Sequence, residues 1–394
     1  MTRDYDLVVF GATGFTGQLV AEYISHAPAR PRWAIAGRNQ AKLEALGLGV
    51  PILVADALDP AAMTRLARAT KVVCTTAGPF AKYGSELVAA CAAAGTHYCD
   101  LTGEVQWMRR MIDAHHERAR ATGARIVHTC GFDSVPSDLG TWAAQQEFIA
   151  RHGRPARSVT ALFGESSGGL SGGTVASALS TADEASQDPG IRALLANPFG
   201  LDPDPAAPHP RCPDVRSIGW EPRLGMFTAP FVMAQVNTRV VRRSHALADL
   251  PWGESFCYRE VMSTPGSARG LAMAVGITGG LGVLALAFAH PRLRALLAKR
   301  APRPGEGPTS AVRERGHWKA RFIAESGTDQ LIYIASDRAD PGYGSTAKML
   351  GESALCLALD PLTSGGGVTT PSVAMGGALL DRLRRAGLTF AAAG

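Results

Sequence analysis

The sequence is poor in cysteine and in aromatic residues, and these scarcities exclude several classes of protein. Seven cysteines, an odd number without a C-x-x-C pair, predict reduced thiols in a cytosolic compartment. The neighbouring His115 and His116 lack further ligands at metal spacing, so we expect no metal site. Basic residues are scattered rather than interleaved with aromatic ones, and we therefore expect no nucleic-acid partner despite a net charge of +6.

Two further absences concern targeting and catalysis. The charged residues 1–6 lead directly into an apolar segment, so we expect a cytoplasmic protein without a signal peptide. The first 150 residues contain no Tyr-x-x-x-Lys pair of the short-chain dehydrogenase type. A content of 46% hydrophobic and 19% charged residues is typical of a globular protein, and 394 residues favour two domains.

The most informative stretch is residues 7–17, LVVFGATGFTG. A short apolar run ends in three glycines with two residues between each, and a helix-like segment follows. A strand that turns sharply into a helix to bind a dinucleotide needs glycine at three positions. These are the bend of the backbone, the point where the diphosphate approaches the backbone, and the point where the helix packs on the strand. The helix N-terminus attracts the phosphates. We assign to this dinucleotide site Gly11, Thr13, Gly14, Phe15, Thr16 and Gly17.

Strands and helices alternate over residues 1–150, which predicts a Rossmann-type, doubly wound parallel sheet. The cofactor would then lie at the carboxyl ends of the strands. After the first strand, apolar segments predict further strands at 33–38, 51–57, 71–77, 96–101 and 124–129.

The end of the second predicted strand indicates which cofactor is preferred. It reads Gly37-Arg38-Asn39, with no carboxylate to bind a ribose 2′-hydroxyl. Arg38 can instead form a charge-assisted fork with a 2′-phosphate, which favours NADP over NAD. The alternative is a surface arginine. Asp56, after the third strand, is expected either to contact the adenine or to cap a helix.

The next loops carry the candidates for chemistry. Small residues at 77–79 would let the nicotinamide half of the cofactor pass close to the backbone; otherwise this segment is only a turn before a core aromatic. Polar residues are dense at 97–104 and 131–140. The alternative for Glu104 is a first-turn acid, and for Ser134 or Ser137 a helix cap. The predicted site residues here are Ala77, Gly78 and Pro79 for the cofactor, and Tyr98, Asp133 and Glu104 for catalysis.

The second half of the chain predicts a mixed α/β domain over residues 151–340. Its strands, at 157–166, 254–264, 317–326 and 328–338, favour a largely antiparallel sheet.

Residues 271–289 form a segment of nineteen residues without charge, and basic residues flank it on both sides. Its length falls within the roughly 17–25 residues of a spanning helix, but four glycines weaken its helical propensity. Two interpretations remain open. The segment is either buried or dimer-forming, or it contacts a membrane surface together with the basic residues up to 303.

Several motifs together resemble one family. GATGFTG, AGR, TTAGPF, YCDLTGE and GFDSVPSDLG, followed by GYGSTAKML and GGGVTTP, look like the saccharopine dehydrogenase-like oxidoreductases. Within that family the chain most resembles the mycobacterial-type trans-acting enoyl reductases. The resemblance implies a Rossmann domain and a mixed α/β domain, with residues 341–394 returning to the first.

The resemblance also implies an activity. NADPH would reduce a double bond in a polyketide-derived lipid precursor, and a polyketide synthase would be the partner. Alternatives are an amino-acid dehydrogenase of the saccharopine type, or a cofactor-binding membrane adaptor without catalysis. A lipid substrate would suit a cytoplasmic protein at the inner face of the plasma membrane, and a homodimer is compatible with the sequence.

Overall fold

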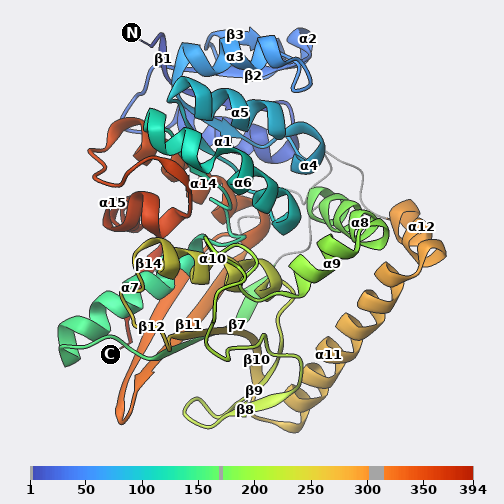
Figure 1. Ribbon diagram of the computed structural model, residues 1–394, viewed down its shortest axis with the longest axis vertical. Coiled ribbons are helices and arrows are strands. Elements are labelled where there is room, and N and C mark those ends of the chain that lie inside the picture. Colours follow the sequence, from blue (N-terminus) through green and yellow to red (C-terminus); the bar gives the residue numbers. More distant parts are fainter. Residues whose placement is uncertain (1–2, 168–171, 301–314, 394) are drawn as a thin grey trace.

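The described residues form two seven-stranded sheets, A and B, which lie in different halves of the molecule (Figure 1). The computed structural model describes residues 3–167, 172–300 and 315–393. Sheet A, whose first strand leads into the glycine-rich turn, lies in the upper part of the view in Figure 1, and sheet B lies in the lower part.

Sheet A is a doubly wound parallel sheet with strand order β13-β6-β5-β4-β1-β2-β3. The predicted Rossmann-type fold is therefore confirmed. In the inner strand β1, successive side chains from Leu7 to Phe10 are all buried, because helices cover both faces of the sheet. The strands are β1 (Tyr5–Phe10), β2 (Trp33–Gly37), β3 (Ile52–Val54), β4 (Thr70–Thr75), β5 (His97–Cys99), β6 (Arg125–Val127) and β13 (Gly367–Thr369).

The helices between these strands begin where the sequence provides caps. The Asn39 side chain accepts a hydrogen bond from the N–H of Lys42 at 3.0 Å, and Asp59 caps the N–H of Ala61 at 2.9 Å. The helices are α1 (Phe15–Ser25), α2 (Gln40–Glu44), α3 (Pro60–Ala69), α4 (Phe80–Tyr83), α5 (Ser85–Ala94) and α6 (Val105–Thr122).

Sheet B is mixed, with strand order β14-β12-β11-β7-β10-β9-β8. Neighbouring strands are antiparallel except β7 and β10, so the prediction of a largely antiparallel sheet is confirmed. The strands are β7 (Ser158–Ser167), β8 (Gly219–Glu221), β9 (Met226–Pro230), β10 (Cys257–Pro265), β11 (His317–Ser326), β12 (Asp329–Asp337) and β14 (Thr389–Ala392).

The C-terminal segment connects the two sheets. Strand β13 pairs with β6 of sheet A, whereas β14 pairs with β12 of sheet B. Helix α14 packs on α1 and against β1 and β4. The helical elements of this segment are the π-helical turn η1 (Pro341–Ser345), α14 (Thr346–Leu359) and α15 (Pro371–Arg385). Earlier in the chain lie α7 (Val135–His152) and α10 (Ala234–Leu247).

The remaining helices of the described residues are α8 (Gly172–Gln187), α9 (Pro189–Ala196), α11 (Ala268–Ala289) and α12 (Pro291–Arg300), and α11 packs on β9 and β10 of sheet B. Helix α11 runs along the outside of the molecule (Figure 1), and only Gly270 and Ala274 of its residues are buried. The interpretation of residues 271–289 as a buried segment is therefore wrong.

The prediction that all cysteines are reduced is also wrong. Cys212 and Cys257 form a disulfide in this structure, whereas the other five cysteines are free and buried. These two residues are 45 positions apart, and the fold brings the start of β10 beside the loop that holds Cys212. Spacing along the chain could not reveal such a pair.

Candidate active site

A cleft of about 1110 Å³ opens at the carboxyl ends of β1 to β4. One wall consists of the loops of sheet A. Helices α8 to α12 provide the opposite wall, and Tyr343 of η1 completes the lining. This position, beside the first strand of a doubly wound sheet, is where such folds bind ligands.

The glycine turn forms the floor of the cleft, and its backbone needs glycine at two points. Gly11 has a φ of +85°, a conformation that L side chains rarely adopt. A Cβ on Gly17 would lie 2.2 Å from the carbonyl oxygen of Gly11, so helix α1 could not pack this closely on β1. The N-cap of α1 is Gly14, which has no side chain to cap the helix, so the first turn presents backbone N–H groups toward the cleft.

The structure brings together all eleven residues that the sequence predicted for the cofactor. Arg38 is exposed on the cleft wall directly after β2. Asp56 lines the cleft too, but its carboxylate also accepts a hydrogen bond from the N–H of Leu58 at 3.0 Å and so stabilises the turn before α3. The full set in the lining is Gly11, Thr13, Gly14, Phe15, Thr16, Gly17, Arg38, Asp56, Ala77, Gly78 and Pro79.

The loop after β4 lies directly against the glycine turn. The N–H of Thr76 donates to the carbonyl of Phe10 at 3.1 Å, and the Thr76 hydroxyl donates to that of Gly11 at 3.2 Å. The Gly78–Pro79 peptide bond is cis. These contacts hold the small residues of this loop beside the turn, as the sequence predicted.

Glu104 holds this loop from behind. Its carboxylate accepts hydrogen bonds from the N–H groups of Phe80 and Ala81 and from the hydroxyl of Ser177 on α8, each at 2.8 Å. Burial raises the pKa of Glu104, although the three hydrogen bonds oppose that change. The side chain is fully buried, and its neighbours Gly103 and Val105 line the cleft instead.

Tyr98 does not line the cleft, contrary to the expectation from sequence. It is fully buried, and its hydroxyl donates to Asp100 at 2.8 Å. The same Asp100 oxygen lies 2.7 Å from Nδ1 of His128. The reason is the alternation of β5, which turns Tyr98 toward the core beneath α5 and α6.

Asp133 lies in the cleft wall, on the loop between β6 and α7. Burial raises the pKa of its carboxyl to about 7, a backbone hydrogen bond lowers it, and the charge of Asp100 raises it further. The next residue, Ser134, occupies the N-cap position of α7, but its hydroxyl donates to Asn237 of α10 at 2.9 Å rather than capping the helix. The loop is thus tied to the opposite wall.

Sequence reasoning missed that opposite wall. It is mostly apolar, and its residues come from five segments that are far apart in the chain. No single motif marks them, although the apolar run at 271–289 includes two. Its aliphatic and aromatic members are Leu195, Val232, Met233, Val236, Leu284, Phe288 and Leu297.

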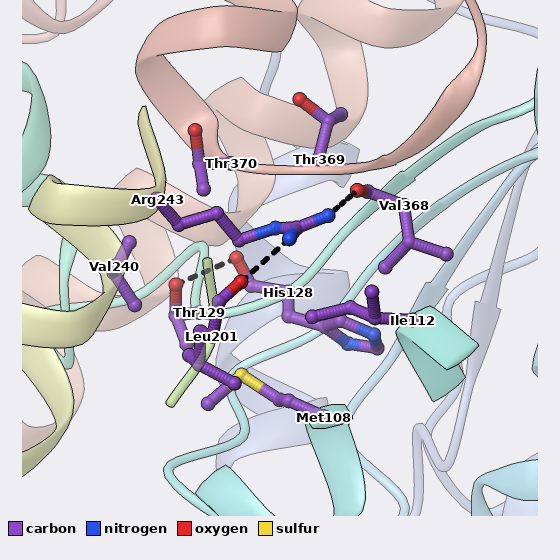
Figure 2. A pocket seen from close by; sticks show the side chains of 10 residues that line it. All are labelled: Met108, Ile112, His128, Thr129, Leu201, Val240, Arg243, Val368, Thr369 and Thr370. Atoms are coloured by element: carbon purple, nitrogen blue, oxygen red, sulfur yellow. Dashed lines mark hydrogen bonds between the residues drawn. The ribbon is translucent and has the colours of Figure 1, made fainter. Parts of the chain in front are cut away.

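A second cavity, shown in Figure 2, is too small for a substrate. Its volume is about 10 Å³, which is room for about one water molecule. Arg243 crosses it and donates to the carbonyls of Leu201 and Val368, both at 2.6 Å. Nε2 of His128 and the hydroxyl of Thr369 have no hydrogen-bond partner among the described residues. The cavity therefore belongs to the buried junction between α10 and β13.

The comparisons with known proteins first define a class. Residues 7–127 match the family model described as the saccharopine dehydrogenase NADP binding domain. Apo saccharopine dehydrogenase (L-Glu forming) from Saccharomyces cerevisiae has a similar structure, with a TM-score of 0.55 over 98% of this chain and 99% of that chain. At 13% identity, this likeness concerns the fold alone. The class is an NADP-binding protein with the saccharopine dehydrogenase fold.

Full-length relatives then identify the family. A Mycobacterium tuberculosis protein named "putative trans-acting enoyl reductase" is 45% identical over 98% of this chain and 97% of its own length. The "trans-acting enoyl reductase" of Mycobacterium ulcerans is 39% identical over 99% of this chain and 98% of its own. This chain belongs to the trans-acting enoyl reductase family. The predictions of the family and of NADP as cofactor are confirmed.

Proposed function

We propose that this protein is an NADPH-dependent enoyl reductase that acts on the acyl chain of a polyketide-derived lipid precursor. The observation that carries the proposal is the composition of the cleft. One wall is a dinucleotide cradle, the other is apolar, and a carboxyl group with a pKa of about 7 lies between them. The names of the full-length relatives support the reaction class.

The cradle side holds the cofactor. The N–H groups at the start of α1 bind the diphosphate, and Arg38 binds the 2′-phosphate. The loop of Ala77, Gly78 and Pro79 receives the nicotinamide end, because it crosses beside the glycine turn. When bound, NADPH supplies the hydride that reduces the β-carbon of the enoyl group.

Asp133 is the candidate acid. In its protonated form it donates the proton that the α-carbon gains, and so completes the reduction of the double bond. A pKa near 7 suits this role, because about half of the carboxyl groups carry the proton at neutral pH and can release it readily.

The other two residues predicted for catalysis hold neighbouring groups in position and do not contact the substrate. Glu104 holds the loop before α4 and ties it to Ser177, and so keeps the nicotinamide side of the cleft in place. Tyr98 helps to orient Asp100, which accepts hydrogen bonds from the N–H groups of Thr102 and Thr129 at 3.1 Å.

The partner that we propose is a polyketide synthase, since a reductase that acts in trans must receive its acyl substrate from another protein. The apolar wall supports a lipid-like chain rather than a small charged amino acid. We place the protein in the cytoplasm, where it could work either as a monomer or as a homodimer.

Purified protein provides the test. NADPH oxidation is followed with enoyl thioesters of increasing chain length, and the reverse reaction is followed with NADP and saccharopine or other amino acids. Oxidation of NADPH by long enoyl thioesters alone is the expected result. Turnover with amino acids would support the dehydrogenase alternative, and NADPH binding without turnover would support an adaptor.

A further inference from the structure

Among the described residues, one helix is long and apolar enough to cross a membrane, and this is α11. Its most apolar window has a mean hydropathy of 2.1, and only 6% of that window is buried. Helices of this composition inside soluble proteins are covered by the core, because exposing such a surface to water is unfavourable. Little of α11 is covered by the described residues, which points to a partner outside the chain.

The helix has an inner and an outer side. On the inner side, Ala274 is buried and Leu284 and Phe288 line the cleft. On the outer side, Val283 and Leu286 are 68% and 70% exposed. The exposed apolar surface continues from α11 onto α12. Its large members are Leu271, Met273, Val275, Val283, Leu286, Leu293 and Leu296.

The charges carried by α11 and α12 themselves have one sign. Residues 268–300 include no aspartate or glutamate, and their basic residues are Arg269, Arg292, Arg294, Lys299 and Arg300. Arg294 is buried and pairs with Asp183 at 2.9 Å, whereas Arg269, Arg292 and Lys299 are exposed. Arg303, which continues this basic run in the sequence, lies outside the described residues. An apolar surface bordered by cations complements a layer of anionic lipid.

We propose that the outer side of α11 and α12 docks on an anionic phospholipid surface, with α11 lying in the plane of that surface. A helix of this length extends about 33 Å, which would also suffice to span a bilayer. However, its inner side packs on β9, β10 and α8, so lipid cannot surround it. A lying helix also keeps Arg269 and Arg292, at its two ends, at the level of the headgroups.

A second copy of the chain fits this surface less well. In a two-fold pairing the same patch faces itself. Each copy would bring exposed cations at both ends of α11 and no carboxylate from residues 268–300 to pair with them. Like charges opposite one another oppose such an interface.

Docking has a consequence for the substrate, and this step rests on the proposed function. Because Leu284 and Phe288 belong to the same helix as the docking surface, the membrane and the cleft lie on opposite sides of one helix. An acyl chain embedded in lipid could therefore reach the apolar wall of the cleft with little exposure to water.

Vesicle flotation of the full-length protein tests the docking. We expect binding to vesicles that contain phosphatidylglycerol and much weaker binding to pure phosphatidylcholine. The double variant Val283→Glu/Leu286→Glu should lose at least about tenfold in vesicle binding, because two charges enter the lipid-facing side. Leu359→Glu, an exposed leucine at the end of α14, is the matched control and should bind as the parent does. Arg292→Glu/Lys299→Glu should weaken the preference for anionic lipid by about tenfold or more.

Three results would overturn the proposal. The first is that the parent protein does not bind vesicles, and the second is that the double variant binds them as well as the parent does. The third is that the parent is a dimer in the absence of lipid and the double variant is a monomer. NADPH titration by fluorescence shows that each variant is folded. Vesicle binding is measured without substrate, so a failure of enoyl reduction with intact vesicle binding would refute the proposed function and leave the docking standing.

Discussion

The two walls of the cleft are built in different ways. The cofactor wall consists of strand ends and tight turns, and its residues include four glycines of the turn and the neighbouring loops: Gly11, Gly14, Gly17 and Gly78. The opposite wall consists mostly of apolar side chains from α8 to α12. A backbone surface depends on local conformation, which short motifs specify, whereas a side-chain surface depends on which distant segments meet.

The difference implies different tolerances to substitution. The cofactor wall should respond sharply to an added Cβ or a lost charge, because a diphosphate needs close approach and fixed donors. The apolar wall should tolerate changes that conserve volume. Residues at the junction of the walls should show the largest effects, since they act on both ligands.

Asp133→Asn should produce the largest loss. Removal of a general acid typically costs about 10²- to 10⁴-fold in rate. NADPH affinity should stay within about twofold, because the phosphate-binding turn is untouched. With the pKa of Asp133 near 7, kcat of the parent should be high below pH 7 and fall as the pH rises through that value.

The Asn variant should lack this decrease, and steady-state rates across pH measure it. Asp381→Asn, an exposed position on α15, is the control. An unchanged pH profile in Asp133→Asn would show that another group supplies the proton.

Gly17→Ala should come next. Its Cβ would meet the carbonyl oxygen of Gly11 at 2.2 Å, so α1 must move away from the turn that we propose holds the diphosphate. We expect NADPH affinity to fall at least about 100-fold, or about 2.7 kcal/mol, by fluorescence titration. Gly365→Ala, where a Cβ meets nothing within 4 Å, is the matched control. Equal affinity in the two variants would contradict the role of the close approach.

Arg38→Ala should weaken NADPH by about 10- to 100-fold, which is the usual contribution of a hydrogen bond to a charged group. NADH, which lacks the 2′-phosphate, should lose little, so the two titrations form an internal control. Arg38→Lys should recover part of the NADPH affinity, because it keeps the charge without the planar fork. Equal losses for both cofactors would mean that Arg38 does not read the phosphate.

Glu104→Gln should have the smallest effect of the four. The two N–H groups of Phe80 and Ala81 donate to different carboxylate oxygens, and in a glutamine one of these oxygens is replaced by an NH2 group, which cannot accept. We expect a loss of about 1–3 kcal/mol in the free energy of unfolding and a severalfold rise in KM for NADPH. Thermal denaturation and kinetics measure these changes. The control is Glu86→Gln, an exposed residue of α5, and a Glu104→Gln variant as stable as this control would refute the linking role.

The site itself shows how far local patterns reach. The eleven residues that motifs predicted for the cofactor all line one cleft, because each follows a strand of a parallel sheet and all such ends meet at one edge. Tyr98 shows where prediction from local patterns fails. In the three-residue strand β5, a shift of one position decides between core and cleft, and the sequence around it is polar enough to suit either.

By itself, the sequence determined the doubly wound sheet, the cofactor turn and the family, since hydrophobic periodicity and glycine positions act through neighbouring residues. The tertiary structure decided the rest. It joined Cys212 to Cys257, turned Tyr98 inward, placed Glu104 behind the cleft and left α11 exposed. Each of these outcomes depends on which distant surfaces pack together, and that packing energy is not contained in any one segment of the chain.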